Sequence, residues 1–588
     1  MYYLFVCSKM SIRTNKMKAV PLLLKQLMIA RSKFHERGRD ESFDGKLEKL
    51  RLDLNKIKDV FVRVKKNEEE LLDTLAEVHA HLCKLERKKL DEDMDDICKR
   101  IKDSAHKLVP VDAFDDSSKE DDHKGGQIFH SSQQLQQPYQ RSRSQFNYYS
   151  LSPLLQYCLN SLVVFPQNSV IRKRNAINLW IGLDSFKDTE TENKTAEELG
   201  EQVIDDLLKC NAIVRNGNGK NPLSNKFRIS TSVRPLLEQR VAIHNANYRG
   251  HCFKVSVYGA TELRYELQLE QKKETLGDRY FGYSIHTVFN VGASYLNFRP
   301  QWVNELKNLV VLQLGRWQDS PLHHIEVESE EFLKELKNLR QLKYLSLRGI
   351  SNIFELPSSI VELEKLLVLD LKACHNLETL PNDISSMKSL THLILSKCYL
   401  LEGMPKGIEK LTNLEVLKGF VISTPGKSPY RISDLVNLKK LKRLSIHIGR
   451  EAIIRDMDFQ SLEGFFELKC LKISWSVSDS RYDIFQTILP PRLRKFHLEC
   501  FPGKSFLRQF LPGERKGSLS SLEVNISGGK VEIMEVDFKW WKVDILRLKY
   551  LKRLNVDIDD LKSFFPELKY VEIKQISNHS YIEHEWDS

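Results

Sequence analysis

Leucines recur along the C-terminal half of the chain with a fixed step of 24 residues. The pattern LxxLxxLxL places its third leucine at Leu345, Leu369, Leu393 and Leu417. The two leucines of LxL lie on the same face of an extended strand, so each copy predicts a short strand with one buried face. Strands that repeat at a constant step predict a solenoid in which neighbouring units share one continuous core.

A second motif, LPxxI, repeats with the same step and is centred on Pro357, Pro381 and Pro405. A period of 24 residues is typical of leucine-rich repeats, in which the chain turns back along the convex side after each strand. Looser copies of the pattern flank this core. We therefore predict an α/β leucine-rich-repeat solenoid over residues 301–588. Cys374 and Cys398 each follow the second leucine of LxL by three residues, where a small polar side chain meets the backbone of the turn, so we expect them to be structural.

The N-terminal part has a helical pattern instead. Apolar residues recur in alternating steps of three and four from Leu47 to Leu85, with a break at residues 65–70. This spacing predicts an α-helical coiled coil or helical bundle, and the break predicts the turn of a helical hairpin. Similar spacing on both sides predicts further helices. We expect a helical domain over residues 1–110 that self-associates or binds a partner helix.

The chain between these two parts changes composition twice. Residues 111–148 are rich in acidic residues, glycine, glutamine and serine, and they predict a disordered linker because such a segment buries little apolar surface. Residues 149–245 again have the composition of a globular domain. We predict that residues 246–300 form a connecting segment.

Short motifs in the middle domain are Leu155–Cys158, Phe165–Pro166 and Leu179–Ile181. They resemble the winged-helix segment of plant coiled-coil nucleotide-binding leucine-rich-repeat disease-resistance proteins of the RPP type. The resemblance implies an α/β winged-helix domain with its next helix at Thr195–Leu208 and its wing at Asn211–Phe227. The order of helices, winged helix and repeats also matches that family, which implies a role in plant innate immunity.

The chain departs from the family where nucleotide would bind. In the family a nucleotide-binding domain precedes the winged helix, whereas residues 111–148 occupy that interval here. The phosphate-binding motif GxxxxGK[ST] occurs nowhere in the sequence. The family's Met-His-Asp triplet, whose histidine touches the nucleotide, aligns with Ile229–Thr231. We expect no cofactor and no enzymatic activity. The alternative is that the chain is a fragment of a nucleotide-dependent ADP/ATP receptor.

Charge and hydropathy narrow the classes of function. The net charge is +11, with 90 basic and 79 acidic residues interspersed, which does not argue for nucleic acid. A winged-helix DNA-binding regulator stays an alternative, because Arg172, Lys173 and Arg174 form a basic run. No apolar run reaches the roughly 18 residues of a membrane span. We therefore expect a cytoplasmic protein without membrane insertion.

Residues between and beside the repeat leucines point away from the core, so we predict that they form a concave binding face. Stacking of the repeats would align basic side chains in continuous rows that read acidic groups, with aromatic residues among them as hot spots. The expected partner is a protein: a pathogen effector, a guarded host protein or another receptor of the family. The candidate residues are Lys343, Tyr344, Arg348, His392, Lys442, Arg443, His447, Lys469, Lys472, Trp475, Lys552 and Arg553.

Overall fold

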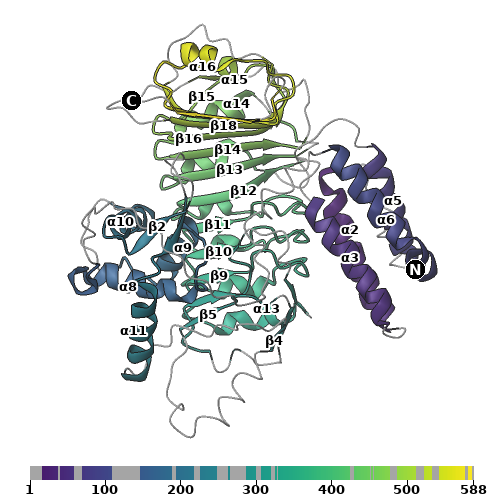
Figure 1. Ribbon diagram of the computed structural model, residues 1–588, viewed down its shortest axis with the longest axis horizontal. Coiled ribbons are helices and arrows are strands. Elements are labelled where there is room, and N and C mark those ends of the chain that lie inside the picture. Colours follow the sequence, from purple (N-terminus) through teal and green to yellow (C-terminus); the bar gives the residue numbers. More distant parts are fainter. Residues whose placement is uncertain are drawn as a thin grey trace, which may run out of the picture.

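The computed structural model contains a helical bundle, a winged-helix domain and a curved solenoid (Figure 1). The bundle and the winged-helix domain lie on opposite sides of the solenoid in this view. The structure describes residues 16–36, 40–57, 69–108, 146–187, 194–216, 225–247 and 262–264, and most of the chain from 286 to 585 apart from short segments, the longest at 319–324, 424–429, 477–485, 512–521 and 533–541. The expected linker at 111–148 therefore lies outside the described residues, apart from its last three positions.

Among the N-terminal residues that the structure describes, four helices form a bundle: α2 (Lys16–Glu36), α3 (Glu41–Ile57), α5 (Glu69–Lys84) and α6 (Arg87–Leu108). Helices α2 and α6 each pack against both α3 and α5. The heptad positions Leu47, Leu54, Leu75 and Leu82 are all buried in the shared core, as the spacing predicts. The expected turn at 65–70 falls largely outside the described residues. A supercoiled coiled coil is not confirmed, and self-association stays a prediction.

The middle domain has the winged-helix elements that the resemblance implies. The indole nitrogen of Trp180 donates to the carbonyl oxygen of Cys158 at 3.1 Å and to Ser161 Oγ at 2.9 Å, which ties the second helix to the first. Thr195 caps the third helix together with Glu198 in a capping box. The helices are α8 (Pro153–Ser161), α9 (Lys173–Gly182), α10 (Ala196–Lys209) and α11 (Arg234–Asn247); the antiparallel sheet has the order β1 (Ile171–Arg172), β3 (Lys226–Ile229), β2 (Ile213–Arg215).

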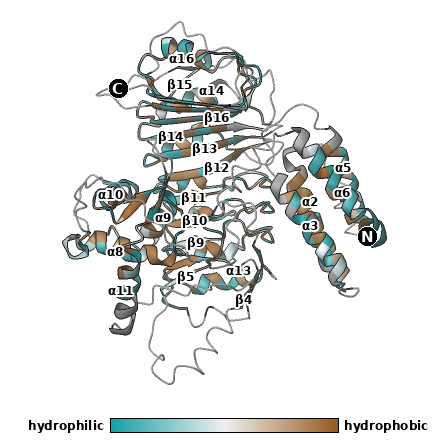
Figure 2. Ribbon diagram, in the orientation of Figure 1, coloured by the Kyte–Doolittle hydropathy of each residue, from teal (hydrophilic) through white to brown (hydrophobic). Residues whose placement is uncertain are grey.

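The solenoid is built on one thirteen-stranded sheet whose neighbouring strands are parallel except for the last pair. Leu345, Leu369, Leu393 and Leu417 pair directly with one another across four strands, which confirms the 24-residue step. Figure 2 shows hydrophobic residues along these strands. The strands in chain order are β5 (Thr287–Phe289), β7 (Val311–Gln313), β9 (Tyr344–Ser346), β10 (Val368–Asp370), β11 (His392–Ile394), β12 (Val416–Ile422), β13 (Arg443–Ile448), β14 (Cys470–Trp475), β16 (Lys495–Phe501), β18 (Leu522–Gly529), β19 (Val543–Lys549), β20 (Tyr570–Lys574) and β21 (Tyr581–Glu585).

Short helices return the chain along the convex side. The LPxxI motifs form 3-10 turns in three successive repeats, as expected. Burial raises the pKa of the Cys374 thiol to about 12, and its Sγ donates to the carbonyl oxygen of Leu347 at 3.1 Å, so the structural role predicted for this slot is supported. The main elements of this side are α13 (Phe332–Glu335), η6 (Ser358–Glu362), η7 (Ile384–Ser386), η8 (Ile408–Lys410), η9 (Ile432–Asn437), α14 (Asp456–Gln460), η10 (Ser461–Gly464), α15 (Phe506–Gln509) and α16 (Ile558–Phe564).

One boundary differs from the prediction. The sheet begins at β5, inside the expected connecting segment 246–300, because residues before the first clear leucine motif already pair with β7. Two smaller parallel sheets stand apart from it. They comprise β4 (Glu262–Arg264), β6 (Tyr295–Asn297) and β8 (Glu326–Val327), and β15 (Thr487–Ile488) with β17 (Phe510–Leu511). The solenoid therefore begins before residue 301.

Candidate functional site

The winged-helix domain covers the N-terminal part of the concave face (Figure 1). Helix α9 packs on strands β9 and β10, and Tyr344 and Val368 of those strands join the core of the winged-helix domain. At the end of α9, a Cβ added to Gly182 would lie 2.4 Å from the Cβ of Tyr344. A glycine at this position therefore lets the helix approach the sheet closely.

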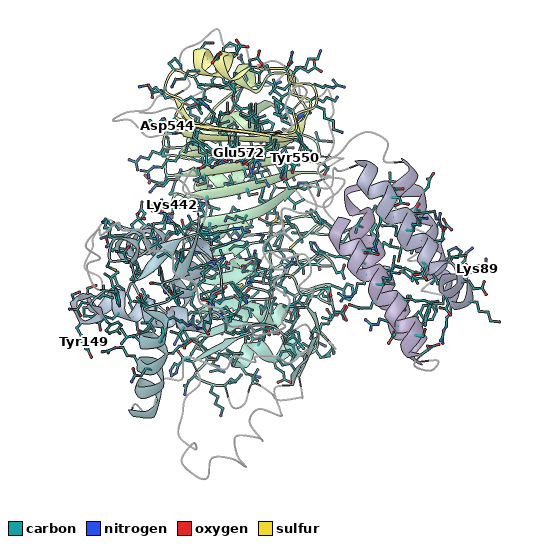
Figure 3. The ribbon with its side chains drawn as sticks, in the orientation of Figure 1. Lys89, Tyr149, Lys442, Asp544, Tyr550 and Glu572 are labelled. Atoms are coloured by element: carbon teal, nitrogen blue, oxygen red, sulfur yellow. The ribbon has the colours of Figure 1, made fainter. Side chains whose placement is uncertain are left out.

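Acidic residues at the start of α10 meet basic residues of the solenoid beyond this apolar contact. Glu197 accepts a hydrogen bond from Arg443 Nε at 2.8 Å, and His392 Nε2 lies 3.5 Å from its carboxylate. Glu198 accepts from Lys442 Nζ at 3.2 Å and also from Lys469 (Figure 3 labels Lys442). The interface therefore combines an apolar centre with a charged margin.

The electrostatics keep these carboxylates ionised. Burial raises the pKa of Glu197, but Arg174 and His392 outweigh burial and leave the pKa below its ordinary value. Burial also opposes ionisation of Glu198, whereas hydrogen bonds from Lys469, the Thr195 backbone and Lys442 lower its pKa to about 2. Both carboxylates are thus charged in the docked state, as ion pairs with partly buried cations require.

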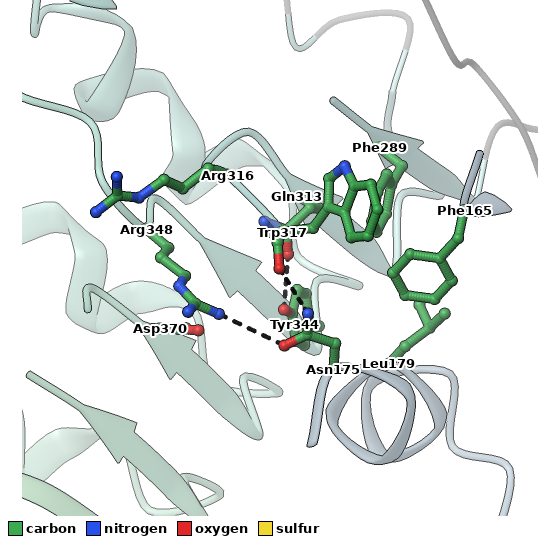
Figure 4. A pocket seen from close by; sticks show the side chains of 10 residues that line it. All are labelled: Phe165, Asn175, Leu179, Phe289, Gln313, Arg316, Trp317, Tyr344, Arg348 and Asp370. Carbon is green, nitrogen blue, oxygen red and sulfur yellow. Dashed lines mark hydrogen bonds between the residues drawn. The ribbon is translucent and has the colours of Figure 1, made fainter. Parts of the chain in front are cut away.

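A narrow cavity lies in the seam between the two domains (Figure 4). Asn175 of α9 donates to the carbonyl oxygen of Trp317 at 2.6 Å and accepts from Arg348 at 3.4 Å. The hydroxyl of Tyr344 donates to Gln313 Oε1 at 2.7 Å. Polar contacts thus line the seam alongside the aromatic rings of Phe165, Phe289 and Trp317.

The structure brings seven of the predicted partner-binding residues together, but beneath the winged-helix domain. Lys343 donates to Asp184 at 2.5 Å, and Tyr344, Arg348, His392 and Lys442 are each less than one tenth exposed. The expectation that these side chains face solvent is wrong, because another domain of the same chain covers them. The seven residues are Lys343, Tyr344, Arg348, His392, Lys442, Arg443 and Lys469.

Two predicted residues lie farther along the concave face. His447 is hydrogen-bonded to Ser474 Oγ at 3.0 Å and to Ser476 Oγ at 2.9 Å. Lys472 pairs with Glu499 at 2.6 Å and keeps a side-chain exposure of 36%. The contacts described for both residues lie within the solenoid, and neither residue pairs with the winged-helix domain among these contacts.

Three predicted residues are misplaced. Trp475 is 1% exposed and packs edge-on against Phe501, because it has the same parity along its strand as the buried Leu471 and therefore faces the core. Lys552 and Arg553 lie in a turn after β19, so their predicted strand does not form. They therefore do not lie on the strands of the concave face.

The expected continuous basic rows do not form either. One row of paired positions begins with Arg443 and Cys470 and continues with Lys495 and Glu523. Lys495 pairs with Glu523 across neighbouring strands. The concave face therefore carries charges of both signs instead of a continuous basic row.

Sequence reasoning missed the acidic side of the interface. Glu197, Glu198 and Glu201 all accept hydrogen bonds from the solenoid or from Arg174. The sequence does show that the first turn of α10 and the segment Lys442–Arg443 have opposite charges. Only the fold shows that these two segments meet.

Among the helices that the structure describes, none combines the length and hydrophobicity needed to cross a bilayer.

Comparisons with known proteins agree with this architecture. Residues 287–582 match the model of a leucine-rich repeat region, and residues 164–236 match the model of the disease resistance protein winged helix domain. Disease resistance RPP13-like protein 4 of Arabidopsis thaliana is 27% identical over 447 residues, which cover 73% of this chain and 49% of that protein. The chain thus spans about half the length of this curated relative.

Solved structures give weaker likenesses. A leucine-rich-repeat protein of Leptospira interrogans is 18% identical, with 54% of this chain and 75% of that chain covered and a TM-score of 0.32. The Arabidopsis receptor kinase HAESA, in complex with the peptide hormone IDA and the co-receptor SERK1, is 16% identical, with 50% and 54% covered and a TM-score of 0.27. These TM-scores are too low to support a shared overall fold. The repeat model, however, matches half of the sequence, and the chain belongs to the leucine-rich-repeat family as a relative of the plant disease-resistance proteins of the RPP type.

Proposed function

We propose that this chain acts in plant defence as a recognition module that binds a protein partner through its leucine-rich repeats, without catalysis and without its own nucleotide switch. Its relation to a disease-resistance protein supports the role in defence. The main support for binding through the repeats is that the winged-helix domain covers only one part of the concave face. Ion pairs hold the winged-helix domain on the part from Lys343 to Lys469, and the strands beyond carry a patterned charged surface.

The proposed partner surface comprises the concave side of strands β14 to β20. Lys472 and Lys495 keep side-chain exposures of 36% and 40%. Lysines of this surface pair with carboxylates, since Lys495 pairs with Glu523 and Lys549 pairs with Glu572 at 2.5 Å. Such a surface of mixed charge favours a partner with matching charges over one with uniform charge. The candidate partners are a pathogen effector, a guarded host protein or another resistance receptor.

The test compares variants of the full chain in plant tissue. The tagged protein is recovered from leaves, and bound proteins are identified by mass spectrometry. Neutralising Lys472 and Lys549 to glutamine should remove specific partners that the wild type retains. The matched control neutralises Lys410 and Lys439, which are exposed on the convex side and in a turn. The proposed surface is wrong if both double variants recover the same partners as the wild type.

The absence of a nucleotide switch is tested separately. The sequence has no phosphate-binding motif, and Ser230 bonds with Ser232 where the family has its nucleotide-touching histidine. Calorimetry of the full chain with ADP and ATP should give no specific binding. A dissociation constant in the low micromolar range would instead favour the reading of the chain as a fragment of a nucleotide-dependent receptor.

The packing of α9 argues against the alternative of DNA binding. Residues Ala176 to Gly182 of α9 are buried against the rest of the protein. Arg174 is paired with Glu197 at 2.6 Å and with Glu201 at 2.9 Å. A helix packed in this way does not present base-reading side chains to a groove. A gel shift at moderate salt should show no specific complex with duplex DNA.

A further inference from the structure

An arginine lies against two tyrosine rings on the outer side of the winged-helix domain. The guanidinium carbon of Arg240 lies 4.1 Å from the ring centroid of Tyr148 and 4.4 Å from that of Tyr149. The two tyrosines belong to η2 (Tyr148–Ser150), and Arg240 belongs to α11. Figure 3 labels Tyr149 on the side of the domain that faces away from the solenoid. These side chains therefore belong to a surface that is separate from the concave face.

The two tyrosines differ in burial. Tyr148 is 5% exposed, and its hydroxyl accepts from Asn160 Nδ2 at 2.8 Å, so it is part of the core of the domain. Tyr149 is 77% exposed, and its ring stands edge-on to that of Tyr148 at 5.9 Å. The backbone nitrogen of Tyr149 donates to Asn147 Oδ1 at 3.0 Å, which caps this short turn. The exposed ring is thus held beside the guanidinium without being buried itself.

No carboxylate pairs with Arg240 among the residues that the structure describes. The two ring contacts are the interactions described for its side chain, whereas Arg234 of the same helix pairs with Glu238 at 2.7 Å. The sequence explains the difference, because residues 144–171 contain no Asp, Glu, Lys or Arg. This uncharged segment includes η2 and also α8, against which α11 packs. The positive charge of Arg240 is therefore not neutralised by the elements around it.

The N–H groups of Arg240 lack acceptors as well. An aromatic ring attracts the positive charge but supplies no oxygen for the N–H groups. Nε of Arg240 is buried without a hydrogen-bond partner, whereas its two terminal nitrogens are not among the buried atoms. The terminal nitrogens of a guanidinium form a planar fork that matches the two oxygens of a carboxylate. The surface thus combines an open fork with an exposed aromatic ring.

We propose that Arg240 and Tyr149 bind an acidic segment of a partner protein, with a carboxylate on the fork of Arg240 and an apolar side chain on the ring of Tyr149. Tyrosine and arginine are both enriched at binding hot spots. One cation matches the single charge of a carboxylate, whereas a phosphate group carries about −1.5 to −2. This interface is independent of the proposed function, because it lies on a different domain from the strands of the concave face.

The test uses the purified full chain and two fluorescent peptides of equal length. Both peptides contain leucine and phenylalanine, next to aspartate and glutamate in one and next to asparagine and glutamine in the other. Fluorescence anisotropy at low salt should show that the wild type binds the acidic peptide about tenfold more tightly, which corresponds to about 1.4 kcal/mol. Arg240→Gln should remove this preference, and Tyr149→Ala should weaken the binding of both peptides. Added salt should reduce the preference, because it screens exposed charges.

Arg228→Gln is the matched control for the loss of charge. Arg228 is exposed on β3 of the same domain, and the structure describes no ion pair or side-chain hydrogen bond for it. This variant should keep the wild-type preference for the acidic peptide. Tyr149→Ala should keep the wild-type melting temperature, because the ring is mostly exposed. A loss of binding in that variant therefore does not reflect unfolding.

Four results would overturn the proposal. The first is no binding of the acidic peptide by the wild type at millimolar concentration, and the second is equal affinity for the two peptides at low salt. The third is an unchanged preference in Arg240→Gln. The fourth is a dimer of the wild type in light scattering that Arg240→Gln dissociates, which would assign the surface to a second copy of the chain.

Discussion

Replacing Glu197 by glutamine removes one negative charge from the most enclosed ion pair between the winged-helix domain and the solenoid. The Glu197 side chain is 5% exposed, and its carboxylate lies 2.6 Å from Arg174, 2.8 Å from Arg443 and 3.5 Å from His392. Burial also disfavours the ammonium of the neighbouring Lys418. The substitution keeps the shape of the side chain but leaves these cations with less compensation.

The structure sets the expected size of the effect. Breaking a buried ion pair by removing one partner costs roughly 3–5 kcal/mol, because a charge is left uncompensated in a poorly solvated place. Arg174 and Arg443 both keep Glu201 as a second partner, and Glu201 is 50% exposed. We therefore expect a loss at the low end, about 3 kcal/mol. This corresponds to a shift on the order of a hundredfold in the equilibrium between docked and undocked domains.

Hydrogen–deuterium exchange of the full chain measures this equilibrium. In Glu197→Gln, amides of α9 and of the covered strands β9 to β11 should exchange on the order of a hundredfold faster. Amides in the C-terminal strands should be unaffected. Glu364→Gln is the control, since Glu364 is an exposed glutamate on the convex side.

The reasoning is refuted if the covered strands stay equally protected in Glu197→Gln. A double-mutant cycle with Arg443→Gln gives an independent check. A coupling energy near zero would mean that the 2.8 Å contact contributes nothing to docking.

Three further predictions follow from burial and charge. Leu369→Ala and Leu393→Ala should each cost roughly 2–5 kcal/mol of unfolding free energy, because both side chains are fully buried; denaturant midpoints equal to the wild type would contradict this. Leu54→Asp combined with Leu75→Asp should melt the bundle, because two charges enter its core; unchanged helical circular dichroism would refute the assignment. The pKa of Glu198 is lowered from an ordinary 4.5 to about 2, so its charged form stabilises docking above pH 4.5. This contribution should be lost as the pH falls from about 4.5 towards 2. The stability of Glu198→Gln should therefore depend less on pH in that range, and an equal dependence would contradict the prediction.

Part of the fold follows from local periodicity. The repeat step, the buried LxL leucines and the convex turns depend on spacings of two and of 24 residues, so the sequence pattern specifies them directly. Trp475 also obeys the period of two residues along a strand. We predicted that it faces solvent, but its parity along β14 places it in the core. The register weakened where the repeats lose their constant step, and the predicted strand at Lys552 and Arg553 was therefore wrong.

The sequence by itself determined that this protein is a repeat solenoid with a winged-helix domain and N-terminal helices, because each part has a short-range pattern. It also singled out basic residues of the solenoid, among them Lys442, Arg443 and Lys469, that pair with the winged-helix domain. Only the tertiary structure decided what those residues meet. Lys442 and Glu198 are 244 positions apart, and no periodicity connects them. Docking depends on the combined shape and charge of two folded surfaces, so the acidic group that the basic residues were expected to bind lies within the same chain.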